Sequence, residues 1–388
     1  MTSCGKILRT ALAGLLFGLL APAAAALAQA FETKAPHAIL IDYDSGTVLF
    51  EKAADEPFAP ASMAKLMTAE IVFRELKAGR LDEDAEFEMS EHAWRRGGAP
   101  SGGSAMYAEL HSRVALRDLL RGLLVQSGND AAIAIAEGIA GSEPAFADLM
   151  NRRAAELGLK GSRFMNANGL HDPDQVVTAR DLATLARHII REYPEYYKIF
   201  SEPEFTWNDI TQSNRNPLID DGIGVDGLKT GYIKESGYGI TVSAIRNTQR
   251  LILVVAGLDS ERDREAEARK LLDWGFRSFQ QVTAFEEGEV VGEGSVYGGV
   301  NGRVPLKAQG PIRVLISRSA GEALRARIVY EGPIMAPVEA GKMVGAFRVW
   351  DGDRVIQDTP LYTAAAVPQG PLHARALDAL GELLFGWL

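Results

Sequence analysis

The sequence predicts an α/β domain with an antiparallel sheet and a helical part, followed by a small all-β sandwich and a C-terminal amphipathic helix. Three observations support this prediction. Within residues 31–279, strand-like segments lie near both ends and helix-periodic segments lie between them. Residues 280–367 consist of short β-rich pieces separated by glycines. In residues 371–388, hydrophobic side chains recur on one helical face.

Residues 31–279 carry a series of alternating elements. Residues 38–50 predict a hairpin that turns at Asp44 and Gly46. A capping box beginning at Thr178 opens a helix that runs to about Arg191. The other helices are expected at 62–75, 116–126, 130–139, 145–157 and 264–272, and further strands at 239–244 and 250–256. We expect the first and last strands to pair in one largely antiparallel sheet.

Residues 280–367 show no recognisable polar site, which favours a spacer or docking module. In the segment 371–388, one stripe of the helix is apolar and the opposite stripe is charged. The apolar stripe contains Leu372, Ala376, Leu380, Leu383 and Trp387. This helix can lie on a membrane surface or pack on the protein. The polar face lacks lysines, which weakens the membrane interpretation, but the closing Leu-Leu-Phe-Gly-Trp-Leu supports it.

The first thirty residues have the layout of a secretory signal peptide. Two basic residues precede an apolar stretch, and the segment ends in Ala-Gln-Ala at 28–30. An uncleaved anchor helix is the alternative, but the apolar stretch is short for a membrane span. We therefore expect cleavage before Phe31 and export of a mature chain of 358 residues.

Charge and cysteine content exclude several classes of protein. The net charge is −10, and it becomes −12 when the first thirty residues are removed. No basic run is present, so we expect no nucleic-acid partner. The single cysteine, Cys4, lies in the expected signal peptide, which excludes disulfides, thiolate metal sites and cysteine nucleophiles from the mature chain. The histidines lack metal-site spacing, and we expect neither a metal nor a cofactor.

Ser62 and Lys65 form the first candidate catalytic pair. Residues three apart share a helix face, so the Lys65 amine can reach the Ser62 hydroxyl near the positive end of the helix dipole. Lys65 must be neutral to accept a proton, which requires burial or a nearby positive charge, for which we expect Lys229. Taken alone, the pair is better explained by an N-cap serine followed by a solvated lysine.

Two further motifs could complete such a site. Ser127-Gly-Asn129 lies between two expected helices, where it could present a hydroxyl and an amide to one cleft. A helix C-cap followed by an N-cap explains the same residues. Lys229-Thr230-Gly231 precedes a strand, where Lys229 would face the site and Gly231 would leave room for an extended substrate. An ordinary strand terminus is the alternative.

Two other patterns are dismissed. The segment 222–227 matches a glycine-rich dinucleotide pattern, but it follows a polar loop and opens no helix. There is no G-x-S-x-G elbow and no histidine singled out by its surroundings, so a Ser-His-Asp hydrolase has little support.

The three motifs occur in the order 62, 127 and 229, and together they resemble the S-x-x-K, S-x-N and K-T-G elements of the penicillin-recognising serine enzymes. The resemblance extends to the low-molecular-mass D-alanyl-D-alanine carboxypeptidases. It includes the segments 60–68, 126–132, 168–170, 178–181, 214–216 and 225–232, and it covers essentially the whole mature chain. It implies a transpeptidase-like catalytic domain at 31–279, a β-sandwich domain at 280–367 and a membrane-association helix at 371–388.

The resemblance also implies roles for individual residues. Ser62 would attack the carbonyl between two terminal D-alanines of a peptidoglycan stem peptide, with Lys65 as proton acceptor. Ser127 would relay the proton to the leaving amine, and water would hydrolyse the acyl-enzyme. The remaining roles would be substrate binding, by Asn129, Lys229, Thr230, Gly231, Tyr232 and Arg264. The backbone N–H groups of Ser62 and Tyr232 would form the oxyanion hole.

The expected protein is thus a periplasmic carboxypeptidase of peptidoglycan synthesis and cell shape, inhibited covalently by β-lactams and attached peripherally to the inner membrane. A β-lactamase shares the three motifs but has no use for a second domain or a terminal helix. A non-catalytic envelope scaffold is the third possibility, and the intact set of motifs speaks against it. The acidic loop before Val225 leaves the role of Arg215 open.

Overall fold

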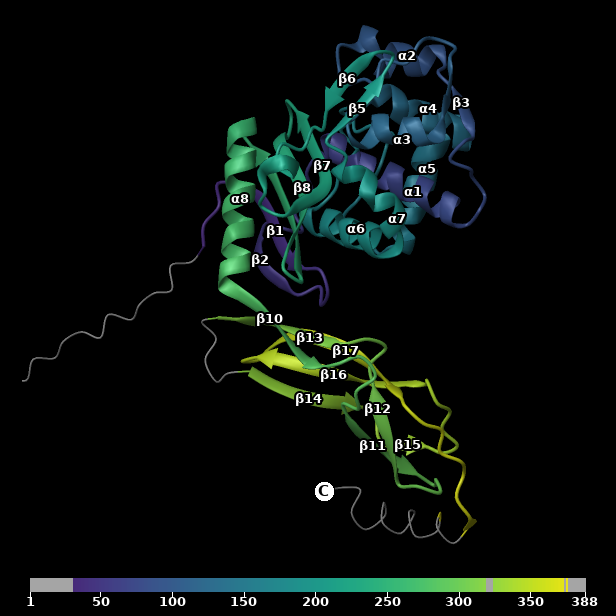
Figure 1. Cartoon of the computed structure of the whole chain (residues 1–388), viewed down its shortest axis with the longest axis vertical. Coiled ribbons are helices and arrows are strands. Elements are labelled where there is room, and N and C mark those ends of the chain that lie inside the picture. Colours follow the sequence, from purple (N-terminus) through teal and green to yellow (C-terminus); the bar gives the residue numbers. More distant parts are fainter. Residues whose placement is uncertain (1–30, 319–323, 373–374, 376–388) are drawn as a thin grey trace, which may run out of the picture. The chain divides into compact units, whose positions relative to one another are not determined.

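The computed structural model describes residues 31–318, 324–372 and 375 (Figure 1). The expected signal peptide, residues 1–30, lies outside the described residues, as does most of the expected amphipathic helix, residues 371–388. Within the described ranges, no helix is long and apolar enough to cross a membrane.

A five-stranded antiparallel sheet forms the centre of the first domain, in the strand order β2-β1-β9-β8-β7. Its strands are β1 (His37–Asp42), β2 (Val48–Lys52), β7 (Val225–Ile233), β8 (Gly237–Arg246) and β9 (Gln249–Leu258). β1 pairs directly with β9, so segments more than two hundred residues apart in sequence are neighbours. The expected pairing of the first and last strands is confirmed, and it leaves β7 as an edge strand.

Helices cover both faces of this sheet, with α8 on one side and the helical part on the other (Figure 1). The helices are α1 (Lys65–Lys77), α2 (Glu91–Gly97), α3 (Leu116–Leu124), α4 (Asn129–Ala140), α5 (Glu143–Glu156), α6 (Ala179–Glu192), α7 (Pro194–Tyr197) and α8 (Glu261–Ser278). Single 3-10 turns are η1 (Ala61–Ala64), η2 (Ala99–Ser101), η3 (Lys198–Ser201) and η4 (Ile219–Asp221). Two small antiparallel pairs complete the domain. β3 (Glu86–Glu88) pairs with β4 (Arg113–Ala115), and β5 (Glu204–Trp207) forms a hairpin with β6 (Ile210–Ser213).

Side-chain caps explain where two of these helices begin. The Thr178 hydroxyl accepts a hydrogen bond from the Asp181 N–H at 3.1 Å, which confirms the expected start of α6. The Ser260 hydroxyl accepts a hydrogen bond from the Asp263 N–H at 3.0 Å and so caps α8. The helix therefore begins at Glu261, three residues earlier than expected. The prediction of 264–272 was too short because the first turn of α8 is charged and gives no apolar period.

Ser62 does not begin an α-helix, which corrects the expected helix at 62–75. It lies in the turn η1, whose first residue has no side-chain cap, and α1 starts at Lys65. In a 3-10 turn, side chains three residues apart are nearly eclipsed, so the Ser62 and Lys65 side chains still point the same way. Most of α1 is buried, including Leu66, Met67 and Phe73, so the element carrying Lys65 runs through the core.

Residues 279–369 form a separate all-β region with its own hydrophobic core. A two-stranded sheet pairs β10 (Phe279–Phe285) with β13 (Ile312–Ser317). A six-stranded sheet contains, in spatial order, β14 (Leu324–Tyr330), β16 (Met343–Asp351), β17 (Arg354–Thr363), β12 (Arg303–Lys307), β11 (Gly292–Tyr297) and β15 (Ile334–Met335). Buried residues of both sheets share one core, among them Val314, Val304 and Leu361. The predicted β domain is therefore present.

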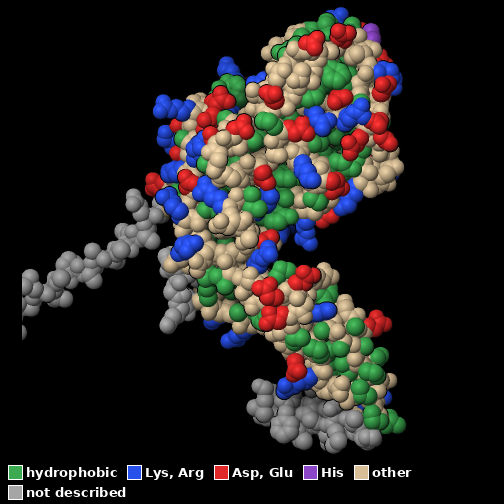
Figure 2. Space-filling model, in the orientation of Figure 1, with side chains coloured by type: hydrophobic (Ala, Val, Ile, Leu, Met, Phe, Trp, Pro, Cys, Tyr) green, Lys and Arg blue, Asp and Glu red, His purple; other side chains and the backbone are tan. Residues whose placement is uncertain are grey.

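On the face shown in Figure 2, acidic and basic side chains are interspersed over the first domain, and the basic ones form no continuous stripe.

Candidate active site

A cavity of about 260 Å³ opens where η1, the edge strand β7 and the start of α8 meet. Six of the nine predicted site residues line it: Ser62, Ser127, Thr230, Gly231, Tyr232 and Arg264. The other three, Lys65, Asn129 and Lys229, are buried and do not line the cavity. The structure therefore brings the three sequence motifs together from η1, from the α3–α4 turn and from β7.

Lys65 is positioned to activate Ser62. The Lys65 Nζ lies 3.0 Å from the Ser62 Oγ and 2.7 Å from the Asn129 Oδ1, and it also donates to the backbone carbonyl of Asn168. All three partner atoms are uncharged at neutral pH. The Lys65 side chain has no exposed surface, so the alternative of a solvated lysine is wrong.

Burial lowers the pKa of Lys65 to about 7, against smaller opposing effects of the Asp130 and Glu143 carboxylates. Above that pH the amine is neutral. Its two N–H groups can then donate to Asn129 and Asn168 while its lone pair faces the Ser62 hydroxyl. This is the geometry of a general base beside its nucleophile.

Lys229 is buried as well, at mid-strand in β7, so the alternative of a strand terminus is wrong. Burial lowers the pKa of Lys229 well below its usual value, and the positive charges of Lys65, Arg215 and Arg264 add to this. Burial is the largest cause of the lowered pKa of both lysines. Repulsion between two positive charges acts on both of them, so a role of Lys229 in keeping Lys65 neutral stays a prediction.

Gly231 lets β7 pack closely on η1. A Cβ on Gly231 would lie 3.0 Å from the Pro60 carbonyl oxygen and 3.1 Å from the Ala61 Cβ. These contacts are tighter than nine in ten that a real Cβ makes, so the Ser62 turn would have to move by a few tenths of an ångström. Glycine thus lets the backbones of β7 and the Ser62 turn approach closely, which is a different reason from the substrate approach that the sequence suggested.

The turn between α3 and α4 holds Ser127 in an unusual state. Its backbone has a φ of 69°, in the left-handed region that non-glycine residues rarely adopt. Its hydroxyl is buried and makes no hydrogen bond with any described residue. The first residue of α4, Asn129, makes no capping bond, and its side chain binds Lys65. The N-cap half of the alternative explanation is therefore wrong, whereas the turn does bond back to α3, through the Gly128 N–H and the Gly122 carbonyl at 2.8 Å.

The loop 166–170 contributes a backbone atom that sequence reasoning missed. Its carbonyl at Asn168 receives the Lys65 amine. The loop is held by the Thr68 hydroxyl, which donates to the Ala167 carbonyl at 2.7 Å, and by the Glu143 carboxylate, which accepts from the Asn168 amide at 3.2 Å. Gly169, with a φ of 85°, lies so close to Ala61 that a Cβ there would overlap the Ala61 carbonyl oxygen.

The far wall of the cavity is cationic and aromatic. Arg264 on α8 is almost fully buried, and its Nη2 donates to the exposed Glu261 carboxylate at 2.5 Å. Its guanidinium lies 5.8 Å from the Tyr238 ring, which stacks on Tyr232 at 4.2 Å. The Arg264 Nε makes no hydrogen bond with any described residue. This wall can bind an anion such as a carboxylate.

Four residues that line the cavity were not predicted: Ser104, Arg215, Tyr238 and Glu261. Arg215 was noticed and its role was left open. Nothing in the sequence marks Ser104, which reaches the cavity because its carbonyl accepts from the Asn129 N–H at 2.8 Å. For Tyr238, the signal was its register opposite Tyr232 in the β7–β8 hairpin.

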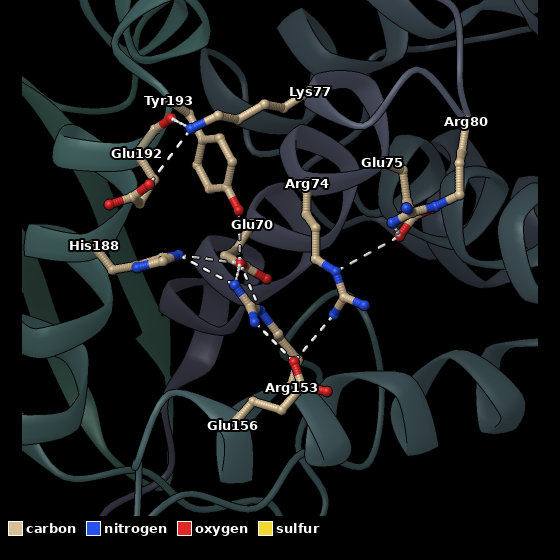
Figure 3. A network of polar contacts seen from close by, with 10 residues as sticks. All are labelled: Glu70, Arg74, Glu75, Lys77, Arg80, Arg153, Glu156, His188, Glu192 and Tyr193. Atoms are coloured by element: carbon tan, nitrogen blue, oxygen red, sulfur yellow. Dashed lines mark hydrogen bonds and ion pairs between the residues drawn. The ribbon is translucent and has the colours of Figure 1, made fainter.

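A buried ionic cluster anchors α1 behind the site (Figure 3). Glu70 of α1 has no exposed side-chain surface, and its Oε1 lies 2.7 Å from Arg153 Nη2, 3.3 Å from His188 Nε2 and 3.0 Å from the Tyr193 hydroxyl. These partners come from α5, α6 and the start of α7. Burial alone would raise the pKa of Glu70, but hydrogen bonds from His188 and Arg153 hold it below its usual value.

Comparison with known proteins matches both regions to described families. Residues 23–260 match the D-alanyl-D-alanine carboxypeptidase model Peptidase_S11, and residues 279–369 match the C-terminal domain of penicillin-binding protein 5. The chain is 38% identical to D-alanyl-D-alanine carboxypeptidase DacC of Escherichia coli, over 100% of this chain and 98% of that protein.

Solved structures agree with these matches. Penicillin-binding protein 5 from Haemophilus influenzae superimposes with a TM-score of 0.80 at 37% identity, covering 87% of this chain and 99% of that one. Penicillin-binding protein D2 from Listeria monocytogenes, in its ampicillin-bound form, gives a TM-score of 0.55 at 28% identity, covering 63% of this chain and 98% of that one.

Proposed function

The chain belongs to the D-alanyl-D-alanine carboxypeptidase family of serine peptidases, and we propose that it removes the terminal D-alanine from peptidoglycan stem peptides with Ser62 as nucleophile. One observation carries the assignment. A buried lysine whose pKa is about 7 lies 3.0 Å from the hydroxyl of Ser62, at the mouth of a cationic cavity. A serine hydroxyl is a weak nucleophile until such a base takes its proton.

Acylation begins when the Ser62 Oγ attacks the carbonyl carbon between the two D-alanines and its proton moves to the Lys65 amine. The resulting oxyanion is bound by the backbone N–H groups of Ser62 and Tyr232, each worth about 3 kcal/mol in such sites. The proton then passes to the nitrogen of the leaving D-alanine through the Ser127 hydroxyl, which has no other partner among the described residues. The C–N bond breaks, and an ester on Ser62 remains.

Deacylation uses the same groups in reverse. Lys65, again neutral, takes a proton from water, whose oxygen attacks the ester carbonyl. The shortened peptide leaves with its new carboxylate, and the proton returns to the Ser62 oxygen. The Asn129 side chain accepts a hydrogen bond from Lys65 and also binds the substrate amide. These two contacts hold the base close to the scissile bond.

The substrate carboxylate is the group that the cationic wall recognises. Arg264 and the Thr230 hydroxyl bind it, and Lys229 and Arg215 supply positive potential. Its negative charge favours the protonated form of Lys229, because opposite charges raise the pKa of a lysine. The same chemistry admits the carboxylate of a β-lactam, as expected of a protein similar to penicillin-binding protein D2 from Listeria monocytogenes, which has ampicillin-bound and cefotaxime-bound structures.

The chain organisation completes the proposal. We infer that residues 1–30 direct export to the periplasm, that 31–279 is the catalytic domain and that 280–367 is a β domain. We further infer that 371–388 attaches the protein to the inner membrane. Truncation after Gln369 should move the protein from the membrane fraction to the soluble fraction, and unchanged fractionation would count against the helix as an anchor.

The nucleophile is tested with a fluorescent penicillin and with diacetyl-Lys-D-Ala-D-Ala. The parent chain should be labelled and should release D-alanine, whereas Ser62→Ala should do neither. Labelling of that variant would exclude Ser62. Rapid turnover of the penicillin would favour a β-lactamase. An absence of D-alanine release in the parent, with altered cell shape when the protein is deleted, would favour a scaffold.

A further inference from the structure

A second cavity, of about 340 Å³, lies between α6 and the β1–β2 hairpin. It shares no lining residue with the reaction cavity. Its size is within the range of sites that bind small organic molecules. None of the roles proposed above uses it.

One part of this cavity is apolar. Ile39 and Ile41 occupy alternate positions of β1 and so face the same side of the sheet, and Val48 of β2 and Leu157 complete the surface. The side chains of Ile39 and Ile41 are almost fully buried. This surface can accept a short hydrocarbon chain.

The other part is cationic, and most of its charges already have partners. Arg180 binds the carboxylates of Asp55 and Glu51 at 2.7 Å and 2.6 Å. His188 is bound to the Glu70 cluster (Figure 3). Among the described residues, the ion pair of Arg191 is a long one, at 3.9 Å, with Glu192, which also lines the cavity.

Arg187 is different because its guanidinium is fixed but not neutralised. Its Nε donates to the Tyr43 carbonyl at 2.6 Å and its Nη2 to the Asp44 carbonyl at 2.7 Å. Among the described residues, no carboxylate oxygen lies within 4.0 Å of it. Its Nη1 lies over Gly46, where a Cβ would be 3.1 Å away, so glycine leaves the room that Arg187 occupies. Burial and the charge of Arg191 lower the pKa of Arg187, against smaller opposing effects of Asp42, Tyr43 and Asp44.

We propose that this cavity binds a small carboxylate that carries a short hydrocarbon chain. The carboxylate would accept hydrogen bonds from the Nη1 of Arg187 and from Arg191. The chain would lie on the surface formed by Ile39, Ile41, Val48 and Leu157. Two backbone carbonyls already fix the plane of the Arg187 guanidinium, so the side chain loses little further conformational entropy when it binds an anion. A single negative charge matches Arg187, the lining arginine that has no carboxylate oxygen within 4.0 Å among the described residues.

Octanoate is the probe, titrated into the full chain by calorimetry with and without prior acylation by penicillin, which fills the reaction cavity. We expect saturable binding of one octanoate per chain in both states. 1-Octanol, which has the same chain but no charge, should bind at least tenfold more weakly. Octanoate binding that disappears after penicillin treatment would place the anion in the reaction cavity and overturn the proposal.

Variants locate the site. Arg187→Gln should weaken octanoate binding at least tenfold, while Arg95→Gln, an exposed arginine of α2, should leave it unchanged. Thr184→Trp, at the exposed rim on α6, should block the cavity without touching Arg187. Penicillin labelling of each variant checks that it is folded. Equal octanoate affinity in the parent, Arg187→Gln and Thr184→Trp would overturn the assignment.

Discussion

Two ionisable side chains of α1, Lys65 and Glu70, are both fully buried, yet burial has opposite outcomes for them. The partners of Lys65 are a hydroxyl, an amide oxygen and a backbone carbonyl, none of which carries a charge. The partners of Glu70 include Arg153 and His188. The lysine therefore loses its charge near pH 7, whereas the carboxylate keeps its charge. Within one helix, a buried side chain with uncharged partners becomes neutral and can act as a base, whereas one with partners of opposite charge stays ionised.

The strongest test of this contrast replaces the base. Lys65→Arg keeps a positive charge that cannot be removed near neutral pH, and Lys65→Met removes the amine. Both should reduce the rate of acylation by penicillin about a thousandfold, within the range for loss of a general base. Stopped-flow measurement of acylation gives the rate. Lys77→Met, a solvent-exposed lysine of the same helix, is the control, and a fast Lys65→Arg variant would refute proton transfer to Lys65.

Glu70→Gln tests the structural ion. It leaves the partly buried Arg153 with the exposed Glu156 as its remaining ionic partner and should lower the free energy of unfolding by about 3 kcal/mol, roughly a hundredfold in the folding equilibrium. Urea unfolding monitored by circular dichroism measures this. Glu156→Gln removes the exposed partner of Arg153 and should cost less than about 1 kcal/mol. Equal effects of the two substitutions would show that burial gives the Glu70 cluster no special role.

The stability from Glu70 should also depend on pH. Its pKa is lower in the folded chain than in the unfolded chain, so its contribution is present above the unfolded value of about 4.5 and is lost as pH falls through the folded value. The difference in unfolding free energy between the parent and Glu70→Gln should therefore shrink below about pH 4.5. A difference that stays constant down to pH 3 would contradict this.

The pKa of Lys65 predicts that the acylation rate falls about tenfold between high pH and pH 6. The neutral fraction of an amine with a pKa of about 7 falls about tenfold between a high-pH plateau and pH 6. The second-order acylation rate should follow this fraction, because only the neutral amine can accept the Ser62 proton. A rate that keeps rising to pH 10 would show that Lys65 behaves as an ordinary lysine.

The smallest expected change in the acylation rate comes from giving Lys65 a partner of opposite charge, as Glu70 has in Arg153. Asn129→Asp would place a carboxylate 2.7 Å from the Lys65 amine and raise its pKa. A shift of one pH unit in the midpoint of the acylation profile reduces the rate at pH 7 about fivefold. Asn129→Ser is the matched control for loss of the amide. If both variants shift the midpoint equally, charge is not the cause.

The sequence was most informative where local chemistry dominates. Thr178 caps α6 as expected, and the β1–β2 hairpin and the buried strands β8 and β9 followed from turn residues and periodicity. The expected boundaries failed at Ser62 and at α8, because a 3-10 turn and a charged first helical turn leave no apolar period.

The site residues likewise fall into two groups, those that a local sequence motif predicts and those that only the tertiary fold reveals. Ser62, Lys65, Ser127 and Lys229 could be selected because their side chains belong to motifs. The Asn168 carbonyl and Ser104 could not, since they reach the site through backbone atoms and tertiary folding. The fit of Gly231 against Pro60 likewise depends on two segments about 170 residues apart, which no local pattern describes.

The backbone of Ser127 has a consequence for how the enzyme can evolve. At a φ of 69°, glycine would be the less strained residue, and a buried hydroxyl with no hydrogen-bond partner among the described residues adds a further cost. Ser127→Gly should therefore raise the melting temperature while nearly eliminating acylation. On the proposed role of Ser127 as proton relay, the chain keeps here a residue that lowers its stability because turnover requires the hydroxyl.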